Sequence, residues 1–276
     1  MGKKQFLAEF QSELHISNSQ IFTYLNCSLR YKFQYVEGRP MERVSIALPF
    51  GSAIHSAIER YYRGVNNNGI PESLDLIKEV FEDGLAVDLE NRSIPIVYKK
   101  DTPDQNSAIQ LGKSLLEAFY ESNKMDGYEI IGIELPLTAR LFTENGEVTE
   151  FMLAGILDLV LKDENGQIIV VDHKTASKPM AQKTADDDNQ MTAYSYLLAA
   201  NKFVFPTAEV YCRFDLLRKL KTPKLEHVLT TRTAAHRKRF AKLATAVLAG
   251  IDAGVFIPQP SWMCTDCAYA DACKSW

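Results

Sequence analysis

The sequence lacks any run of about 18 uncharged apolar residues, the minimum for a helix that crosses a membrane. The opening residues, MGKKQFLAEFQSELH, carry basic side chains but neither the apolar segment nor the cleavage site of a secretory signal. We therefore expect a cytoplasmic protein without membrane contact. The sequence also lacks repeats, low-complexity tracts and Pro/Gly-rich linkers, so we expect its 276 residues to form one domain.

Cysteines are few, and their number, five, is odd. Without a secretory signal, this count indicates metal ligands or free thiols rather than disulfides. Three of them, Cys264, Cys267 and Cys273, lie close together in the closing stretch WMCTDCAYADACKSW. A metal or cluster site normally takes four protein ligands, and four thiolates suit either Zn²⁺ or a [4Fe–4S] cluster. Spacing alone favours zinc.

The net charge of −4 does not indicate a nucleic-acid-binding protein, but the charges are unevenly distributed. Residues 213–242 contain ten Lys or Arg and only two acidic residues. Such a segment is either a solvated surface, which charge alone favours, or a surface that follows a phosphate backbone. Our candidates for phosphate contacts are Arg213, Arg218, Lys219, Lys221, Arg237, Lys238 and Arg239.

The apolar pattern changes its period along the chain. Helical spacing predicts helices over residues 17–37, 51–63, 73–90 and 106–123. Residues 128–141, 151–163 and 167–175 are β-rich and are separated by Asn-Gly turn signals, which predict an antiparallel meander. A helix over 187–201, strands over 207–217 and 224–232, and a helix over 233–252 complete the pattern. The order predicts an α/β fold with a mixed sheet between helices.

Two aspartates and a lysine occupy neighbouring predicted strands. Asp158 lies in the apolar stretch AGILDLVL, and Asp172 lies in the next strand of the hairpin, so both carboxylates can meet at one end of the sheet. Lys174 shares a strand face with Asp172. The two carboxylates and the backbone carbonyl of His173 would give an oxygen site for Mg²⁺ or Mn²⁺. Alternatively, the aspartates end strands on a solvated face, and Lys174 pairs with one of them.

With these residues, the chain resembles the PD-(D/E)xK nuclease superfamily, in particular its RecB-like exonuclease branch. The resemblance rests on five separated motifs in the family's order, of which the last is the terminal C-x2-C-x5-C. The first four are GSAIH (51–55), GILD (155–158), DHK (172–174) and QMTAY (190–194). It implies a restriction-endonuclease-like fold: a helical region over 1–127, a catalytic core over 128–232, and a C-terminal helix and cysteine cluster over 233–276.

The resemblance also implies roles for individual residues. Asp158 and Asp172 would be metal ligands, Lys174 the catalytic lysine, and His55 a further ligand. Gln190 and Tyr194 would complete the active site, with Gln190 contacting DNA or the lysine. We expect Gly51, one helical turn before His55, to let another backbone approach the helix.

The terminal cysteines resemble the family's iron–sulfur motif. The resemblance makes Cys27 the fourth ligand and favours a [4Fe–4S] cluster over structural Zn²⁺. Such a cluster would staple the two ends of the chain. Cys212, in the stretch VYCRF, is expected to be a buried core thiol. Glu134, in GIELPL, is either a carboxylate behind the metal ligands or a surface residue at a strand end.

We therefore expect a Mg²⁺- or Mn²⁺-dependent DNA exonuclease acting on single strands or strand ends. Its partners would be DNA and helicase, recombination or CRISPR adaptation proteins. Its role would lie in DNA recombination or repair, phage DNA processing or CRISPR adaptation. One alternative is a DNA-binding or assembly subunit that keeps the nuclease fold with little activity of its own. Another is a zinc-stabilised interaction module in which the D…DxK pattern is incidental.

Overall fold

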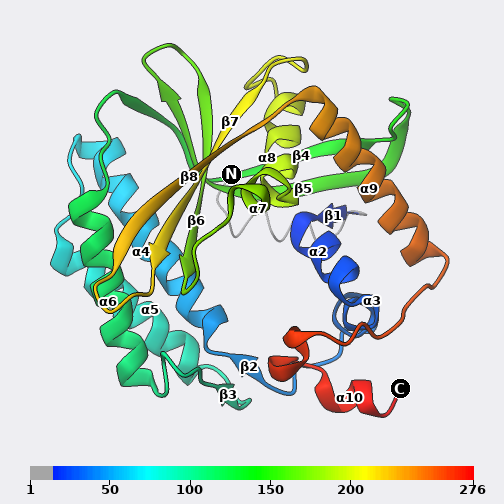
Figure 1. The fold of residues 1–276 in the computed structure, drawn as a ribbon, viewed down its shortest axis with the longest axis horizontal. Helices are drawn as coiled ribbons and strands as arrows, with labels where there is room; N and C mark the ends of the chain where they lie inside the picture. The colour runs from blue at the N-terminus through cyan, green and yellow to red at the C-terminus, as the bar shows by residue number, and fades with distance from the viewer. Residues whose placement is uncertain (1–14) are drawn as a thin grey trace.

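The computed structural model describes residues 15–276, which build a six-stranded mixed sheet with helices on both faces (Figure 1). The sheet order is β1-β5-β6-β7-β8, and β4 pairs with the other edge of β5. The strands are β1 (His15–Ser17), β4 (Tyr128–Phe142), β5 (Val148–Asp163), β6 (Ile168–Ala176), β7 (Val210–Arg218) and β8 (Lys224–Arg232). The predicted mixed α/β sheet between helices is confirmed.

Strands β4, β5 and β6 form the predicted antiparallel meander. Its turns contain Gly146 with φ of 84° and Gly166 with φ of 78°, a left-handed conformation that glycine adopts without steric cost. Helices α7 (Gln182–Asp186) and α8 (Asn189–Ala200) then connect β6 to β7, which pairs with it in parallel, and β8 returns antiparallel. The hairpin thus places Asp158 and Asp172 on adjacent strands.

Helices cover the two faces of the sheet in separate groups. Helices α4 (Ala47–Asn68), α5 (Leu74–Glu90) and α6 (Gln105–Ser122) pack on one face, where Leu159 and Leu161 are buried. Helices α8 and α9 (Ala234–Asp252) cover the other face, where Val160 is buried. This alternation along β5 is the period of two expected of a strand that is buried on both faces. None of the helices within residues 15–276 is long and apolar enough to cross a membrane.

The helix predicted over 17–37 is interrupted at Cys27. The chain forms α2 (Asn18–Asn26), α3 (Ser28–Tyr31) and a π-helical turn (Lys32–Val36), while Cys27 itself is extended, with φ of −164° and ψ of 100°. Sequence periodicity does not reveal such a break because it contains neither proline nor glycine. Six further short elements were not predicted. They are β1, α7, β2 (Val44–Ser45), β3 (Ile96–Val97), the 3-10 helix η2 (Trp262–Asp266) and α10 (Ala270–Lys274).

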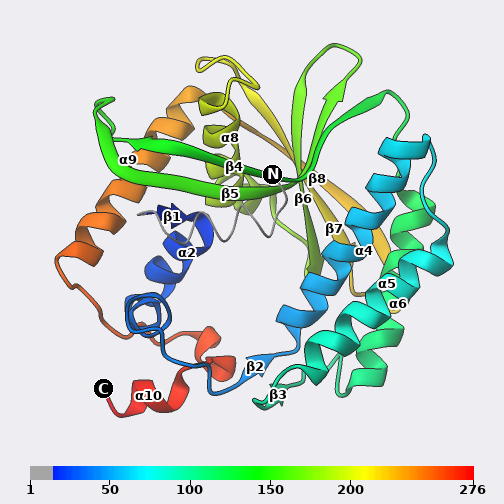
Figure 2. The ribbon, with the colours of Figure 1, turned by 180° about the vertical axis from the view of Figure 1, so that it is seen from behind.

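The C-terminal segment lies against the N-terminal helices in both views (Figure 2). The Leu29 amide donates to the Ile257 carbonyl at 3.1 Å, and the Ile257 amide donates to the Ser28 hydroxyl at 2.8 Å. Further along, Arg43 pairs with Asp271 at 3.0 Å. The two ends of the described chain are therefore joined by direct hydrogen bonds and an ion pair.

Close packing between α5 and α6 depends on Gly112. A Cβ atom built at this position would lie 2.0 Å from Cζ of the fully buried Phe81. We predict that Gly112→Ala lowers the free energy of unfolding by about 1–3 kcal/mol because the Phe81 ring must shift within a packed core. Urea denaturation measures the change.

Gly84→Ala in α5 is the matched control. Its Cβ would meet only Ala53, at an ordinary 3.9 Å, so the variant should gain about 0.5–1 kcal/mol from helix propensity. Equal effects of the two substitutions would contradict the packing explanation.

Candidate active site

The candidate active site lies where β4, β5, β6, α4 and α8 meet. Asp158 lies on β5, Asp172 and Lys174 lie on β6, and Gln190 lies in the first turn of α8. Burial of the two carboxylates is costly unless hydrogen bonds and opposite charges surround them. The neighbouring side chains supply both.

Asp158 is held in its ionised form by donors and positive charge. Its Oδ2 accepts a hydrogen bond from the His173 amide at 2.9 Å and lies 3.3 Å from His55 Nδ1 and 3.6 Å from His173 Nδ1. Burial raises the pKa of Asp158, but the hydrogen bonds from His173 and the charges of both histidines outweigh it and lower the pKa to about 2. Asp158 is therefore a carboxylate at neutral pH.

Asp172 is fully buried, and its two oxygens have different partners. Oδ1 accepts a hydrogen bond from Gln190 Nε2 at 2.7 Å. Oδ2 forms an ion pair with Lys174 Nζ at 2.7 Å, although this contact is not aligned as a hydrogen bond. Burial raises the pKa of Asp172 to about 6; the Lys174 charge opposes the shift, and the Asp158 charge adds to it. An oxygen without an aligned hydrogen bond is suited to a cation.

Lys174 keeps its proton in this arrangement. Burial lowers its pKa, but the charge of Asp172 outweighs that effect and raises the pKa above its ordinary value. Gln190 fixes the ammonium, because its Oε1 accepts from Nζ at 2.8 Å while its Nε2 donates to Asp172 and to the Tyr194 hydroxyl. Lys174 can thus donate hydrogen bonds and supply positive charge.

Tyr194 is buried in α8, and Gln190 donates to its hydroxyl at 2.7 Å. Burial keeps the pKa of this phenol well above its usual range. The neutral hydroxyl contacts Gln190 and helps to position it, while a catalytic role of Tyr194 stays a prediction. The expectation that Gln190 contacts the lysine agrees with this geometry, while a contact of Gln190 with DNA stays a prediction.

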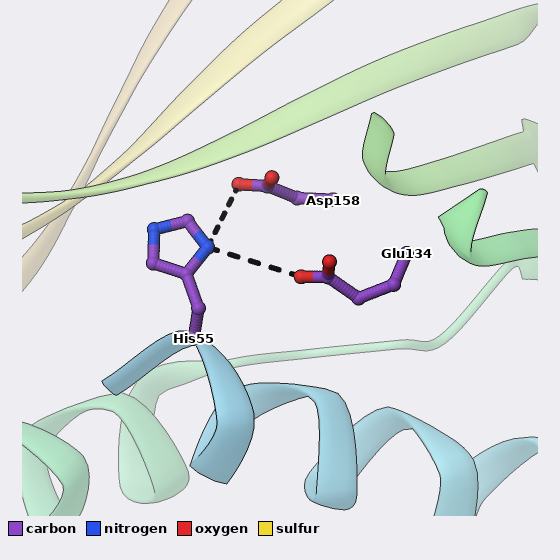
Figure 3. Close-up of side chains that lie close together, drawn as sticks. All are labelled: His55, Glu134 and Asp158. Atoms are coloured by element: carbon purple, nitrogen blue, oxygen red, sulfur yellow. Dashed lines mark ion pairs between the residues drawn. The ribbon is translucent and has the colours of Figure 1, made fainter. Parts of the chain in front are cut away.

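His55, Glu134 and Asp158 converge from three elements (Figure 3). Their ligand atoms lie within 4.8 Å of one another, and within residues 15–276 this is the only such group of three His, Cys, Asp or Glu side chains. His55 Nδ1 lies 4.0 Å from Glu134 Oε1. One imidazole nitrogen and two carboxylates are a donor set that suits Mn²⁺ or Mg²⁺.

Glu134 is the main residue of this site that sequence reasoning undervalued. It is 8% exposed and lies opposite Asp158 in the β4–β5 ladder, and its φ of 47° is rare for a residue with a side chain. Such strain concentrates at functional sites. The alternative of a solvated surface residue was therefore wrong, and Glu134 lies beside the metal ligands.

A buried polar network supports Asp158 from behind. The His173 imidazole lies between Asp158 and Asp215, with its Nε2 3.9 Å from Asp215 Oδ2. Asp215 also pairs with Arg213 at 2.8 Å and with His227 at 2.7 Å. This side-chain role of His173 was not predicted. The use of its backbone carbonyl as a metal ligand stays a prediction.

The basic segment over 213–242 does not form the continuous surface that its charge indicated. Arg213, Arg218 and Arg237 are buried. Arg213 pairs with Asp215, Arg218 pairs with Glu226, and Arg237 donates to Ser195 and to three backbone carbonyls. The prediction that these three contact DNA was wrong, because their guanidinium groups satisfy internal acceptors.

The remaining cations of the segment differ in exposure. Lys219 is largely covered, with its ammonium 4.6 Å from the centre of the Phe50 ring and 3.7 Å from Asp101. Lys221, Lys238 and Arg239 are exposed. Contacts of these four residues with phosphates stay a prediction.

The two motif glycines differ in their surroundings. A Cβ at Gly51 would meet nothing within 4 Å, so the expected close approach of another backbone to this helix was wrong. A Cβ at Gly155 would lie 2.8 Å from Leu197 and 3.5 Å from Tyr194. Gly155 therefore lets α8, which carries Gln190, pack against β5, which carries Asp158.

A separate cavity of about 290 Å³ lies between the joined ends of the chain. Four of the five cysteines line it: Cys27, Cys264, Cys267 and Cys273. Burial raises the pKa of Cys273, and the negative charges of the other three thiolates raise it further. Cys212 instead lies in the core of the sheet, where burial raises its pKa to about 12, as expected for an unreactive thiol.

The comparisons with known proteins agree with this geometry. A model of the PD-(D/E)XK nuclease superfamily matches residues 15–274, so the chain belongs to this superfamily. No curated protein sequence matches the chain. The chain is similar to the crystal structure of a candidate exonuclease from Eubacterium rectale, with 13% identity and a TM-score of 0.57, covering 100% of this chain and 92% of that one. At this identity the likeness establishes the fold alone.

Two further solved structures are much weaker matches. SSO0001 is 14% identical, with a TM-score of 0.32 over 90% of this chain and 94% of that one. Rai1 from Scheffersomyces stipitis is 11% identical, with a TM-score of 0.23 over 90% of this chain and 78% of that one. Scores this low do not establish a shared fold.

The raised pKa of Asp172 predicts how cation binding depends on pH. Because a carboxyl group must lose its proton to bind a cation, and the pKa of Asp172 is about 6, binding should weaken as the pH falls through this value. We expect Mn²⁺ affinity at pH 5 to be about tenfold lower than at pH 7. Isothermal titration calorimetry measures both values.

A second titration separates the carboxylate from the imidazole. His55→Asn removes the nearby imidazole but should keep the same ratio of affinities between the two pH values. A ratio near one in this variant would assign the pH dependence to His55 and contradict the role of Asp172.

Proposed function

We propose that this member of the superfamily is a Mg²⁺- or Mn²⁺-dependent deoxyribonuclease that acts as an exonuclease on single strands or strand ends. The observation that carries the proposal is the convergence of Asp158, Asp172, Lys174 and Gln190 with His55 and Glu134 in one connected site. A role in recombination, repair, phage DNA processing or CRISPR adaptation, alongside helicase or recombination proteins, belongs to the same proposal.

The donor set fits a divalent cation. Asp158, Glu134 and His55 would hold it, with Asp172 on the strand next to that of Asp158. When bound, the cation would polarise the phosphodiester and lower the pKa of an attacking water. Asp158 is already ionised at neutral pH, so no proton need be lost from it on binding.

The protein's own groups then orient the reactants. The Lys174 ammonium donates toward a phosphate oxygen or the attacking water and balances the negative charge that grows on the phosphate. Gln190 and Asp172 fix its position through contacts of 2.8 Å and 2.7 Å, so little reorganisation is needed during the reaction. Tyr194 holds Gln190 in place from the protein interior.

Removal of the lysine tests this role. We predict that Lys174→Ala reduces Mg²⁺- or Mn²⁺-dependent cleavage of end-labelled single-stranded DNA by about 10²–10³-fold, because one preorganised donor to the transition state is lost. Lys162→Ala, which removes a surface lysine paired with Glu129, should cleave normally.

Circular DNA in the same assay reports whether free ends are required. Circular dichroism confirms folding of each variant. Full cleavage by folded Lys174→Ala would contradict the proposed site.

We further propose that Cys27, Cys264, Cys267 and Cys273 hold a [4Fe–4S] cluster that staples the chain ends. The four thiols line one cavity of about 290 Å³ and come from both ends of the described chain. Cys27 lies 237 positions before Cys264, unlike the ligands of a compact zinc finger, which come from one short segment.

Metal analysis tests the cluster. Protein purified without oxygen should be brown, with broad absorbance near about 400 nm and about four irons per chain. Cys27→Ala should lose the iron and much of its solubility, because the link between the chain ends is lost. Cys212→Ala, which removes the one cysteine outside the cavity, should keep both the iron and the solubility of the wild type. Colourless wild-type protein with one zinc per chain would refute the proposal.

A further inference from the structure

A groove of about 1060 Å³ leads from the protein surface to the candidate active site. One wall consists of α2, α3 and the π-helical turn, and the other consists of α7 and the start of α8. Lys174 and Gln190 lie at its inner end. Any polymer whose backbone reaches Lys174 from this side must therefore pass along the α2–α3 wall.

Arg30 stands out in this wall because its charge has no partner. It lines the groove and is partly buried, and its Nε atom is buried without a hydrogen-bond acceptor. Among residues 15–276, every other arginine that is not fully exposed has an acceptor, such as Glu37 for Arg39 or Asp271 for Arg43. A partly desolvated guanidinium without an acceptor is costly, so the site favours an anion that can accept from it.

The same wall exposes two aromatic rings. Phe22 is 52% exposed on α2, and Tyr35 is 38% exposed on the π-helical turn. The Tyr35 ring packs at 5.0 Å from the ring of Tyr31, so it is braced from behind. Exposed, supported rings beside a cation are the features on which unpaired bases stack while the backbone is neutralised.

Acidic groups on the opposite wall do not cancel this character. Asp187 pairs with Lys183 at 2.6 Å, and the Asp188 carboxylate caps α8 by accepting from the Met191 amide at 2.9 Å. Their charges are thus engaged by the chain itself. Of the three cations that line the groove, Lys174 pairs with Asp172 and Lys183 pairs with Asp187, so Arg30 is the one whose charge has no carboxylate partner.

We propose that Arg30 is a phosphate-binding residue for a single nucleic-acid strand that lies in this groove, with its bases against Phe22 and Tyr35. The proposal rests on the proposed nuclease function and names the residues that select a single strand. A duplex keeps its bases paired and stacked on each other, so it offers no free base faces to the two rings.

Binding without cleavage tests the proposal. Fluorescence anisotropy of a labelled oligothymidylate, with Ca²⁺ in place of Mg²⁺, should show about tenfold weaker binding by Arg30→Gln, as expected for loss of a charge-assisted hydrogen bond. The slope of log affinity against log salt should become shallower by about 0.7, the value for one lost phosphate contact on a single strand. Phe22→Ala should weaken single-strand binding and leave duplex binding unchanged.

Matched variants separate this role from a structural one. Arg63→Gln removes an arginine that pairs with Glu59 outside the groove and should bind normally. Arg30→Lys keeps the charge and should recover part of the affinity. Equal binding by Arg30→Gln and wild type, or equal losses in Arg30→Gln and Arg63→Gln, would overturn the proposal.

Two further measurements distinguish the groove proposal from the nuclease proposal and from a role of Arg30 at the cysteine cavity. Hydrolysis of bis(4-nitrophenyl) phosphate, which is too small to span the groove, should be the same for Arg30→Gln and wild type. If neither protein hydrolyses it, the nuclease proposal fails while the binding result still stands. If Arg30→Gln loses absorbance near about 400 nm, Arg30 serves the cysteine cavity instead, and the groove proposal is refuted.

Discussion

The burial of two aspartates on adjacent strands is the constraint on which the rest of the site depends. The Asp172 side chain is fully buried and the Asp158 side chain is only 11% exposed, and the charge of Asp158 adds to the cost of ionising Asp172. Positively charged groups lie beside both carboxylates. His55 and His173 lie beside Asp158, and Lys174 lies beside Asp172. The two carboxyl groups consequently differ, one with a pKa of about 2 and the other of about 6.

This difference is consistent with the proposed cation site. A divalent ion bound there would offset the repulsion between the two carboxylates. Gln190 contributes because it contacts Asp172, Lys174 and Tyr194 with one amide group. Lys174 can therefore stay close to Asp172 while Gln190 also contacts Asp172. In the proposed function, the charge of Lys174 would be directed toward the substrate.

Much of this organisation is predictable from sequence because it is local. The Asn-Gly turns fix the meander, and the apolar run around Asp158 shows that its carboxylate is buried. The position of Glu134 is not predictable in this way. Extending the register of the turn pair Phe142↔Val148 along the hairpin would place Glu134 opposite Ile156. A register shift between Arg140 and Phe142 moves it opposite Asp158, and no residue type there signals the shift.

The prediction of a basic surface over residues 213–242 was wrong for a related reason. Its arginines follow one another in sequence, but alternate positions of a strand point to opposite faces, and a helix presents only part of its surface to solvent. Arg213, Arg218 and Arg237 therefore enter the interior, where they bind acceptors from other elements. Among the arginines of residues 15–276 that are not fully exposed, Arg30, in a stretch with no charge excess, is the one left without an acceptor. A count of charges cannot separate these cases, because the difference lies in which acceptors the fold provides.

Helices α2 and α3 lie between the cysteine cavity, where the chain ends meet, and the groove that contains Lys174 and Gln190. Phe22, Thr23, Asn26 and Arg30 line both the cysteine cavity and the catalytic groove, so the same short wall faces a cavity on each side. Hydrogen bonds from Ser28 and Leu29 to Ile257 hold this wall against the C-terminal segment. The extended conformation of Cys27 interrupts the helix within the wall and places its thiol in the cysteine cavity, while Arg30, three residues later, also reaches the groove. The joining of the chain ends thus sets the position of the groove wall, although none of its hydrogen bonds involves the catalytic residues.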